Sequence, residues 1–205
     1  ALSGVTARVA VSTSRGATEG AATAAAGASD PNRGGAVNFA LNYANGPITA
    51  GWSNWNSTNE GGTALTAATA DQRGDTVQFG YTFPMGLKVG VAWNRSTLNG
   101  AFAAADQSRT AWLLPISYAF GNHGVNFTYA KANATDNVAS SDAKAWTLAY
   151  GYSLSKRTNV GVAYTKLDNN TGASYNLFGA AGRGAVIGAA GNDVSQFSLN
   201  ANHSF

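Results

Sequence analysis

Apolar and polar residues alternate with a two-residue period along most of this chain. In 143–154, large apolar residues share one parity and small or polar residues share the other: Trp146, Leu148, Tyr150, Tyr152 and Leu154 against Ala145, Thr147, Ala149, Gly151 and Ser153. A period of two is typical of a β-strand with one apolar and one polar face. The same alternation continues to the last residue in 194–205. The pattern therefore predicts an all-β fold.

Ten such runs follow one another, and the connections between them alternate in length. The runs are 3–12, 35–44, 48–56, 74–83, 87–96, 109–120, 124–132, 143–154, 158–167 and 194–205. The short connections are 45–47, 84–86, 121–123 and 155–157, and the long ones are 13–34, 57–73, 97–108, 133–142 and 168–193. Short turns at one edge and long loops at the other are typical of a bacterial outer-membrane barrel.

Aromatic residues lie at two heights along the runs. Trp93, Trp112 and Trp146 lie towards the long connections, and Tyr43, Tyr81, Phe83, Tyr118, Phe120 and Tyr152 lie towards the short ones. Two aromatic belts around an aliphatic band match the two interfaces of a membrane. A band about 25 Å tall, crossed at about 40° tilt, needs about ten residues per strand, which is the length of the runs. We therefore predict a transmembrane antiparallel β-barrel, in one domain over 1–205, with short periplasmic turns and long extracellular loops.

The composition agrees with a surface that is only partly in water. Charged residues are 11% of the chain, against about a quarter in ordinary soluble domains, and 44% of residues are hydrophobic. No run of about 18 apolar residues is present, so no transmembrane helix is predicted. The chain has no Cys, which excludes disulfides and thiolate metal sites.

The net charge of +3 does not indicate a nucleic-acid partner. The thirteen Lys and Arg residues are scattered, and only Lys156 and Arg157 are adjacent. A nucleic-acid site needs a basic patch, usually interleaved with aromatic residues. We therefore expect no nucleic-acid binding.

Four stretches resemble one known family, the general porins of β-proteobacterial outer membranes. They are "SGVTARVAVS" at 3–12, "FALNYANGPITAGW" at 39–52, "AYGYSLSKRTNVGVAYTKLDN" at 149–169 and "HSF" at 203–205. The resemblance implies a homotrimer of sixteen-stranded barrels, of which this chain supplies the last ten strands as a C-terminal portion. It also implies a water-filled channel for passive diffusion of small hydrophilic solutes and ions across the bacterial outer membrane. The constriction loop of that family lies between its fifth and sixth strands, outside this chain. The other interpretation is a complete ten-stranded barrel.

The parity of the polar face places three basic residues, Arg8, Lys88 and Arg109, in the lumen. Within the runs, no acidic residue has this parity. Fixed cations in a low-dielectric wall concentrate anions, and rings of Arg or Lys are typical of anion pores. We therefore predict pore-lining basic residues and a mild preference for anions. The alternative interpretation is that these cations only keep the lumen hydrated.

Four other basic residues, Arg95, Lys131, Lys144 and Lys166, have the parity of the lipid face near the long connections. A charge there costs about 2–4 kcal/mol at the membrane midplane and close to nothing at the interface. Either these residues lie at the height of lipopolysaccharide phosphates, or the strands project into water at this end. The expected partners are thus membrane lipid and lipopolysaccharide outside, and small hydrophilic solutes and anions inside.

The C-terminal strand ends in an aromatic residue on the lipid-facing parity. Phe205 and His203 both have this parity. A terminal aromatic strand is thought to be read by the barrel-assembly machinery, so we predict these two residues as an outer-membrane assembly signal.

Two other function classes are weighed against the channel. An omptin-like barrel enzyme needs acidic residues and a His at the extracellular rim, but His123 and His203 both lie towards the periplasmic turns. We predict no catalytic residue, no metal site, no cofactor and no enzyme activity. A ten-stranded binding or adhesion barrel could act through its long loops, but 13–34 and 168–193 are poor in the aromatic residues typical of binding hot spots.

Overall fold

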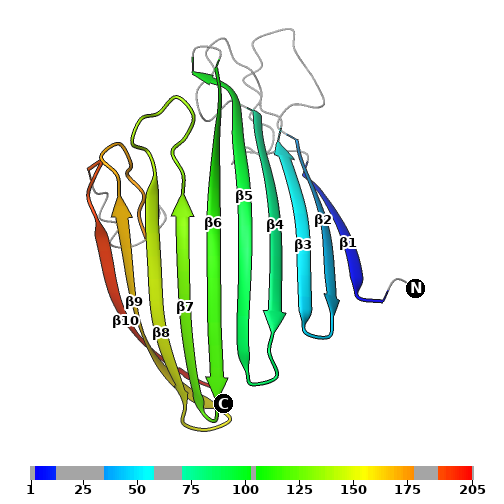
Figure 1. The fold of residues 1–205 in the computed structure, drawn as a ribbon, viewed down its shortest axis with the longest axis vertical. Helices are drawn as coiled ribbons and strands as arrows, with labels where there is room; N and C mark the ends of the chain where they lie inside the picture. The colour runs from blue at the N-terminus through cyan, green and yellow to red at the C-terminus, as the bar shows by residue number, and fades with distance from the viewer. Residues whose placement is uncertain (1–2, 13–34, 58–70, 103–104, 178–188, 205) are drawn as a thin grey trace.

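The computed structural model describes residues 3–12, 35–57, 71–102, 105–177 and 189–204, and these form ten strands (Figure 1). The strands are β1 (Val5–Ser12), β2 (Ala36–Asn45), β3 (Ile48–Ser57), β4 (Asp71–Thr82), β5 (Leu87–Phe102), β6 (Ala105–Phe120), β7 (His123–Ala132), β8 (Ala143–Ser153), β9 (Thr158–Asn169) and β10 (Val194–His203). No helix long and apolar enough to cross a membrane occurs in these ranges.

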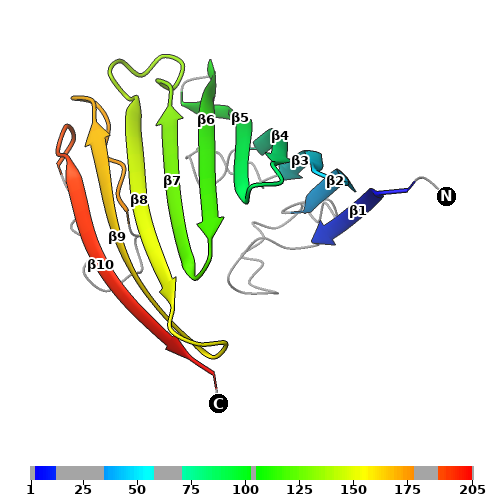
Figure 2. The ribbon, with the colours of Figure 1, turned by 60° about the horizontal axis from the view of Figure 1, so that its bottom comes forward.

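All ten strands belong to one antiparallel sheet in the order of the chain, β1 to β10. Short turns join β2 to β3, β4 to β5, β6 to β7 and β8 to β9 at one end of the sheet, and the longer connection 133–142 between β7 and β8 lies at the other end (Figure 1). The sheet is curved like part of a barrel wall, and β1 and β10 lie at its two edges (Figure 2). The predicted ten strands and their antiparallel arrangement are confirmed, and the predicted alternation of short and long connections fails at one place, between β5 and β6.

The register keeps apolar residues in phase from strand to strand. Val77 of β4 lies opposite Trp52 of β3 on one side and Trp93 of β5 on the other. Residues directly opposite in an antiparallel pair point to the same face, so most large apolar residues of the strands lie on the outer, convex face. Leu199 and Phe197 on β10 are 76% and 63% exposed there. Apolar exposure on this scale is typical of a surface that contacts lipid.

Ring contacts end this apolar face at two heights, as the sequence predicted. Towards the long connections, the rings of Trp93 and Trp112 lie 6.4 Å apart. Towards the short turns, Phe120 stacks on Tyr118 at 5.2 Å and on the imidazole of His123 at 5.0 Å. The His123 ring also lies 4.9 Å from Tyr152. Amphipathic rings of this kind anchor a barrel at the lipid headgroups.

The predicted long loop at 97–108 was wrong. β5 continues to Phe102 and β6 begins at Ala105, so the two strands form one long hairpin with an irregular register between Leu98 and Phe102. Backbone pairing continues in water, whereas a period of two in apolar residues lasts only while one face contacts lipid. The sequence pattern therefore detected the end of the apolar band and not the end of the strands.

Pro115 lies inside β6, an interior strand, although proline cannot donate a hydrogen bond to a neighbouring strand. The β5–β6 register runs to Val89 opposite Ile116 and resumes at Ala92 opposite Leu113. Gly90 faces the proline ring, and a Cβ there would lie 3.1 Å from Pro115 Cγ. The glycine therefore makes room for the ring at the point where pairing is interrupted.

We expect the two faces to respond differently to charge at the middle of the wall. Leu148→Arg places a guanidinium on the outer face, where Leu148 is 49% exposed, and should lower the free energy of unfolding in a lipid bilayer by about 2–4 kcal/mol. Asn126→Arg, on the inner face of β7, is the matched control and should cost less than half as much. Denaturant titration in vesicles measures both values, and equal losses would contradict the assignment of the faces.

Candidate functional site: the inner face of the sheet

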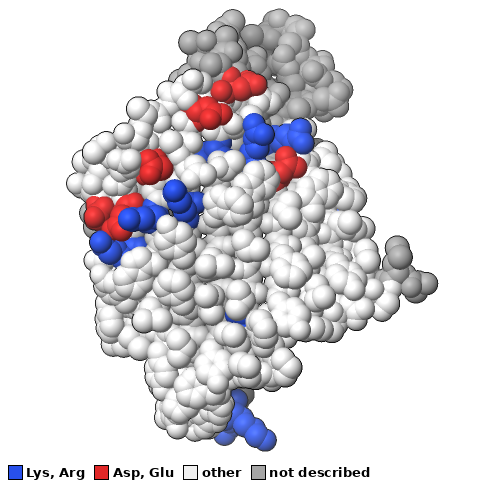
Figure 3. All heavy atoms as spheres, in the orientation of Figure 1, with Lys and Arg blue, Asp and Glu red and all other residues white. Residues whose placement is uncertain are grey.

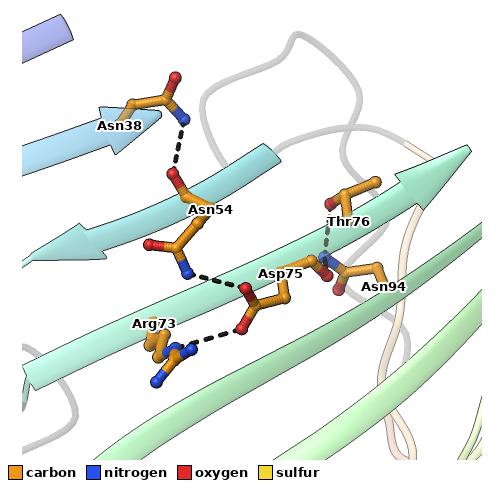
Figure 4. Close-up of polar contacts among 6 residues, drawn as sticks. All are labelled: Asn38, Asn54, Arg73, Asp75, Thr76 and Asn94. Carbon is orange, nitrogen blue, oxygen red and sulfur yellow. Dashed lines mark hydrogen bonds and ion pairs between the residues drawn. The ribbon is translucent and has the colours of Figure 1, made fainter. Parts of the chain in front are cut away.

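The inner, concave face is built from small and uncharged polar side chains. The register places the following residues on it: Thr49, Ser53, Thr76, Gln78, Asn94, Asn126, Thr128, Thr147, Thr165 and Asn200. Hydrogen bonds join neighbouring strands across this face. The Thr147 and Thr165 hydroxyls lie 2.9 Å apart, and Asn94 Nδ2 donates to Thr76 Oγ1 at 3.0 Å (Figure 4). A wall of hydroxyls and amides can form hydrogen bonds with water and with passing solutes without binding any one solute tightly.

Glycines on the inner face leave room for neighbouring amides. A Cβ on Gly51 would lie 2.8 Å from both Asn42 Oδ1 and Gln78 Nε2. A Cβ on Gly161 would lie 2.5 Å from Asn200 Oδ1. These polar side chains therefore lie over the glycines, close to the wall, and do not project into the space in front of it.

The three predicted basic residues all have inner-face parity, but the structure does not bring them together. Arg8 lies opposite Ala40 in the middle of the β1–β2 pair. Lys88 is the second residue of β5, at the short-turn end, opposite Thr82. Arg109 lies towards the long-connection end of β6, opposite Ser96. The cations are therefore spread over three strands and three heights. Their role in solute selection stays a prediction.

The described parts of the strands carry no Asp or Glu on the inner face, in agreement with the sequence parity. One acidic residue, Asp75, lies well inside a strand, β4. Its carboxylate points outwards. It accepts a hydrogen bond from Asn54 Nδ2 at 2.8 Å and forms an ion pair with Arg73, with 3.1 Å between Arg73 Nε and Asp75 Oδ2 (Figure 4). β4 begins at Asp71, before the predicted run 74–83, so Arg73 also lies in the strand. Arg73 has outer-face parity, like the basic residues that the sequence predicted for that face.

A segment that the sequence did not identify, 170–177, folds back onto the inner face after β9. Ala173 is buried against Leu167 and Ala143, which have inner-face parity on β9 and β8. The amide of Gly172 donates to the carbonyl of Ser140 at 2.9 Å, and a Cβ at Gly172 would clash with the carbonyl oxygen of Ala139. Part of the predicted extracellular loop therefore lines the inner wall at the long-connection end.

This segment holds Arg109 through Tyr175. The Asn169 side chain holds the backbone of Tyr175 through two hydrogen bonds. Asn169 Nδ2 donates to the Tyr175 carbonyl oxygen, and the Tyr175 backbone N–H donates to Asn169 Oδ1, each at 3.0 Å. The Arg109 guanidinium donates to the Tyr175 hydroxyl and lies 5.3 Å from the ring centroid. Because tyrosine is neutral, this contact fixes the guanidinium and leaves its positive charge uncompensated.

The outer face carries a charged band above the apolar zone. Figure 3 shows Lys and Arg with acidic residues across the upper part of the face and a broad uncharged area beneath. Lys131 and Lys144 lie directly opposite each other, and Lys166 pairs with Asp168 at 2.8 Å. The three lysines line a depression of about 740 Å³ that also contains Asp142, Asp168 and Asp193. The predicted lipid-side parity of these lysines and of Arg95 is thus confirmed by the register.

The two histidines lie at the short-turn end of the sheet. His123 Nδ1 lies 2.7 Å from the Tyr150 hydroxyl, and His203 Nδ1 lies 2.8 Å from the Thr158 hydroxyl. Phe205, the other half of the predicted assembly signal, lies outside the described residues. In the ranges that the structure describes, no group of three or more His, Asp or Glu residues could hold a metal ion.

Comparison with known proteins identifies a family and a fold. A model of the Gram-negative porin family matches residues 1–172. A solved porin structure, refined at 1.8 Å resolution, superposes with a TM-score of 0.61 at 16% sequence identity. The alignment covers 80% of this chain and 53% of that porin, so the chain spans about half the length of its structural relative. No curated protein matches the sequence.

Proposed function

We propose, because the chain belongs to the Gram-negative porin family, that it forms part of the wall of a water-filled channel for passive diffusion of small hydrophilic solutes and ions. The chain is an outer-membrane β-barrel protein, as the sequence predicted. The narrower resemblance to β-proteobacterial porins, and the homotrimer that it implies, stay predictions. The family and fold are those of channels and not of enzymes.

One observation carries this proposal: the polar inner face and the apolar outer face belong to the same ten strands. The outer face exposes its apolar residues, with Val9 and Val11 at 66% and 70%, and so needs lipid. The inner face is lined by hydroxyls and amides, and so needs water. A wall that separates lipid from water over its full height is what a diffusion channel requires.

The unpaired edges of the sheet favour a barrel with more strands than the ten described. β1 and β10 each pair on one side only among the described strands. In hydrocarbon an unpaired strand edge costs several kcal/mol for each group that lacks a partner. Channel-sized lumens occur in barrels of about sixteen strands, whereas smaller barrels are filled by their own side chains. We therefore propose that further strands, supplied by the same polypeptide, close the barrel between β10 and β1.

The lumen is proposed to prefer anions mildly. Arg8, Lys88 and Arg109 have inner-face parity, and none of them forms an ion pair with a described residue. Acidic side chains in the described strands point to the other face. A net positive wall raises the local concentration of anions and lowers that of cations, and added salt weakens both effects.

The outer charged band is proposed to contact the phosphates of lipopolysaccharide. Like charges directly across a strand pair destabilise a sheet, and Lys131 and Lys144 stand in this position without an ion pair to a described residue. A phosphate between the two ammonium groups would remove the repulsion. The lysines lie above the aromatic residue Trp146, which has its own register partner in Tyr129, and thus at the height of headgroups.

The size of the native polypeptide tests the larger barrel. We expect the intact mass of the denatured protein from its native source to exceed 20.9 kDa by about six strands and their connections. Mass spectrometry of the purified outer-membrane protein measures this directly. A mass equal to that of this chain would contradict the completed barrel and would favour a narrow barrel that acts through its loops.

Ion selectivity tests the role of the lumen cations. In planar bilayers with a KCl gradient, we expect the reversal potential of the full-length protein to indicate chloride preference. The variant Arg8→Gln/Lys88→Gln/Arg109→Gln should lower the chloride-to-potassium permeability ratio by about twofold or more, because three wall charges are lost. Lys156→Gln/Arg157→Gln, in the β8–β9 turn, is the control and should change it less. A cation-selective wild-type channel would refute the anion preference.

Lipid binding tests the outer band. Lys131→Gln/Lys144→Gln should reduce the affinity for lipopolysaccharide about tenfold or more, since each basic residue near an anionic surface contributes about 1 kcal/mol. Lys156→Gln/Arg157→Gln serves again as the control, because it removes the same charge at the other end of the barrel. Titration of the detergent-solubilised protein with lipopolysaccharide gives both affinities. Equal affinity in the two variants would indicate that the band is only solvated.

A further inference from the structure

One row of the inner face, at the long-connection end, places an aromatic ring and a guanidinium on either side of small residues. Trp55 of β3 lies opposite Gly74, Gly74 opposite Ser96, and Ser96 opposite Arg109. The row spans three strand spacings, or about 14 Å between its end Cα atoms. Trp55 has the opposite parity to Trp52 in the same strand, so it lies on the inner face and does not belong to the outer aromatic belts.

The small residues in the middle of the row leave a depression in the wall. A cavity of about 340 Å³ lies here, and its lining includes Trp55, Gly74, Ser96 and Arg109. A Cβ on Gly74 would lie 3.9 Å from Cε3 of Trp55, so the indole ring lies beside the glycine and forms one side of the depression. Ser96 is held down by its hydrogen bond to Asn94 Oδ1 at 2.8 Å.

A second row closes the cavity on the side of the long connections. Gln72 lies opposite Leu98, and Leu98 opposite Gln107, and all three line the cavity. The amides of Gln72 and Gln107 supply hydrogen-bond donors and acceptors, and Leu98 supplies an apolar surface between them. The lining includes two arginines, of which Arg73 is paired with Asp75. The cavity thus combines an aromatic wall, the cation of Arg109 and two amides, which is the composition of a small-molecule site.

Arg109 is prepared to bind an anion. Its guanidinium is fixed from the other side by Tyr175 and forms no ion pair with a described residue. A guanidinium has five N–H donors, and the contact with one tyrosine hydroxyl leaves donors for a carboxylate or phosphate. Because the 170–177 segment is packed on the wall through Ala173, the side chain is already ordered before a solute arrives, which lowers the entropic cost of binding.

We propose that this cavity is a binding subsite for small organic anions that carry a flat or apolar ring, with the ring on Trp55 and the anionic group on Arg109. The subsite rests on the proposed channel function and deepens it, because such a solute would be collected at the mouth before it diffuses through the lumen. The Gln72 and Gln107 amides orient the solute between the two ends of the row. Binding is weak enough for release, since the cavity is open towards the lumen and every contact lies on one side.

The test uses the full-length protein in detergent, with benzoate as the probe and ligand-observed NMR to measure its dissociation constant. Arg109→Gln should weaken benzoate binding about tenfold or more, because a charged hydrogen-bond donor is lost. Trp55→Leu should weaken it about three- to tenfold, because ring stacking is lost, and should leave acetate binding within twofold. Tyr175→Phe keeps the ring and removes the hydroxyl that fixes Arg109, and should weaken benzoate binding about threefold.

Two variants are matched controls. Lys88→Gln removes the same charge from the inner face at the opposite end and should weaken benzoate binding by less than twofold. Trp52→Leu removes an outward tryptophan from the same strand as Trp55 and should have as little effect. The subsite is refuted if the wild type does not bind benzoate, or if Arg109→Gln and Lys88→Gln lose affinity equally. Conductance is recorded separately on the same preparations, so absent conductance with retained benzoate binding refutes the channel and leaves the subsite standing.

Discussion

Backbone hydrogen bonding between neighbouring strands is the constraint on which the rest of this structure depends. Hydrocarbon offers no water to an unpaired N–H or C=O, so a strand that crosses it must be paired on both sides. The continuous order β1 to β10 satisfies every interior strand in this way. The sheet therefore does not need a packed core, and in the described ranges the buried hydrophobic residues are only Ala143, Leu167 and Ala173.

Because no packed core is needed, one face of a strand can contact lipid while the other face contacts water. Parity then decides what a given residue type does. Trp52 and Trp55 are three residues apart on β3, yet the register pairs Trp52 with Val77 on the outer face and Trp55 with Gly74 on the inner face. The first is an apolar side chain against lipid, and the second is an aromatic wall beside a polar cavity. The same residue type in the same strand thus meets two environments, because an odd number of positions separates the two tryptophans.

Local parity explains which features were predictable from the sequence. Ten strands, the aromatic belts and the inner-face parity of Arg8, Lys88 and Arg109 all follow from a two-residue period that can be read within a single strand. The extension of β5 to Phe102 could not be read in this way, because paired strands in water need no apolar face. The Trp55–Arg109 row depends on register across four strands, and the Tyr175 contact joins residues 66 positions apart. Neither leaves a local pattern.

The two faces also differ in how their charged side chains are paired. On the outer band, Arg73 pairs with Asp75 and Lys166 with Asp168, so much of the charge there is balanced within the protein. On the inner face, Arg109 meets a neutral tyrosine instead of a carboxylate. A carboxylate partner would have ordered the guanidinium equally well, but it would have cancelled the field that attracts an anion. Tyrosine orders the side chain and preserves its charge. This choice of partner distinguishes a cation that holds the wall together from one that is available to a solute.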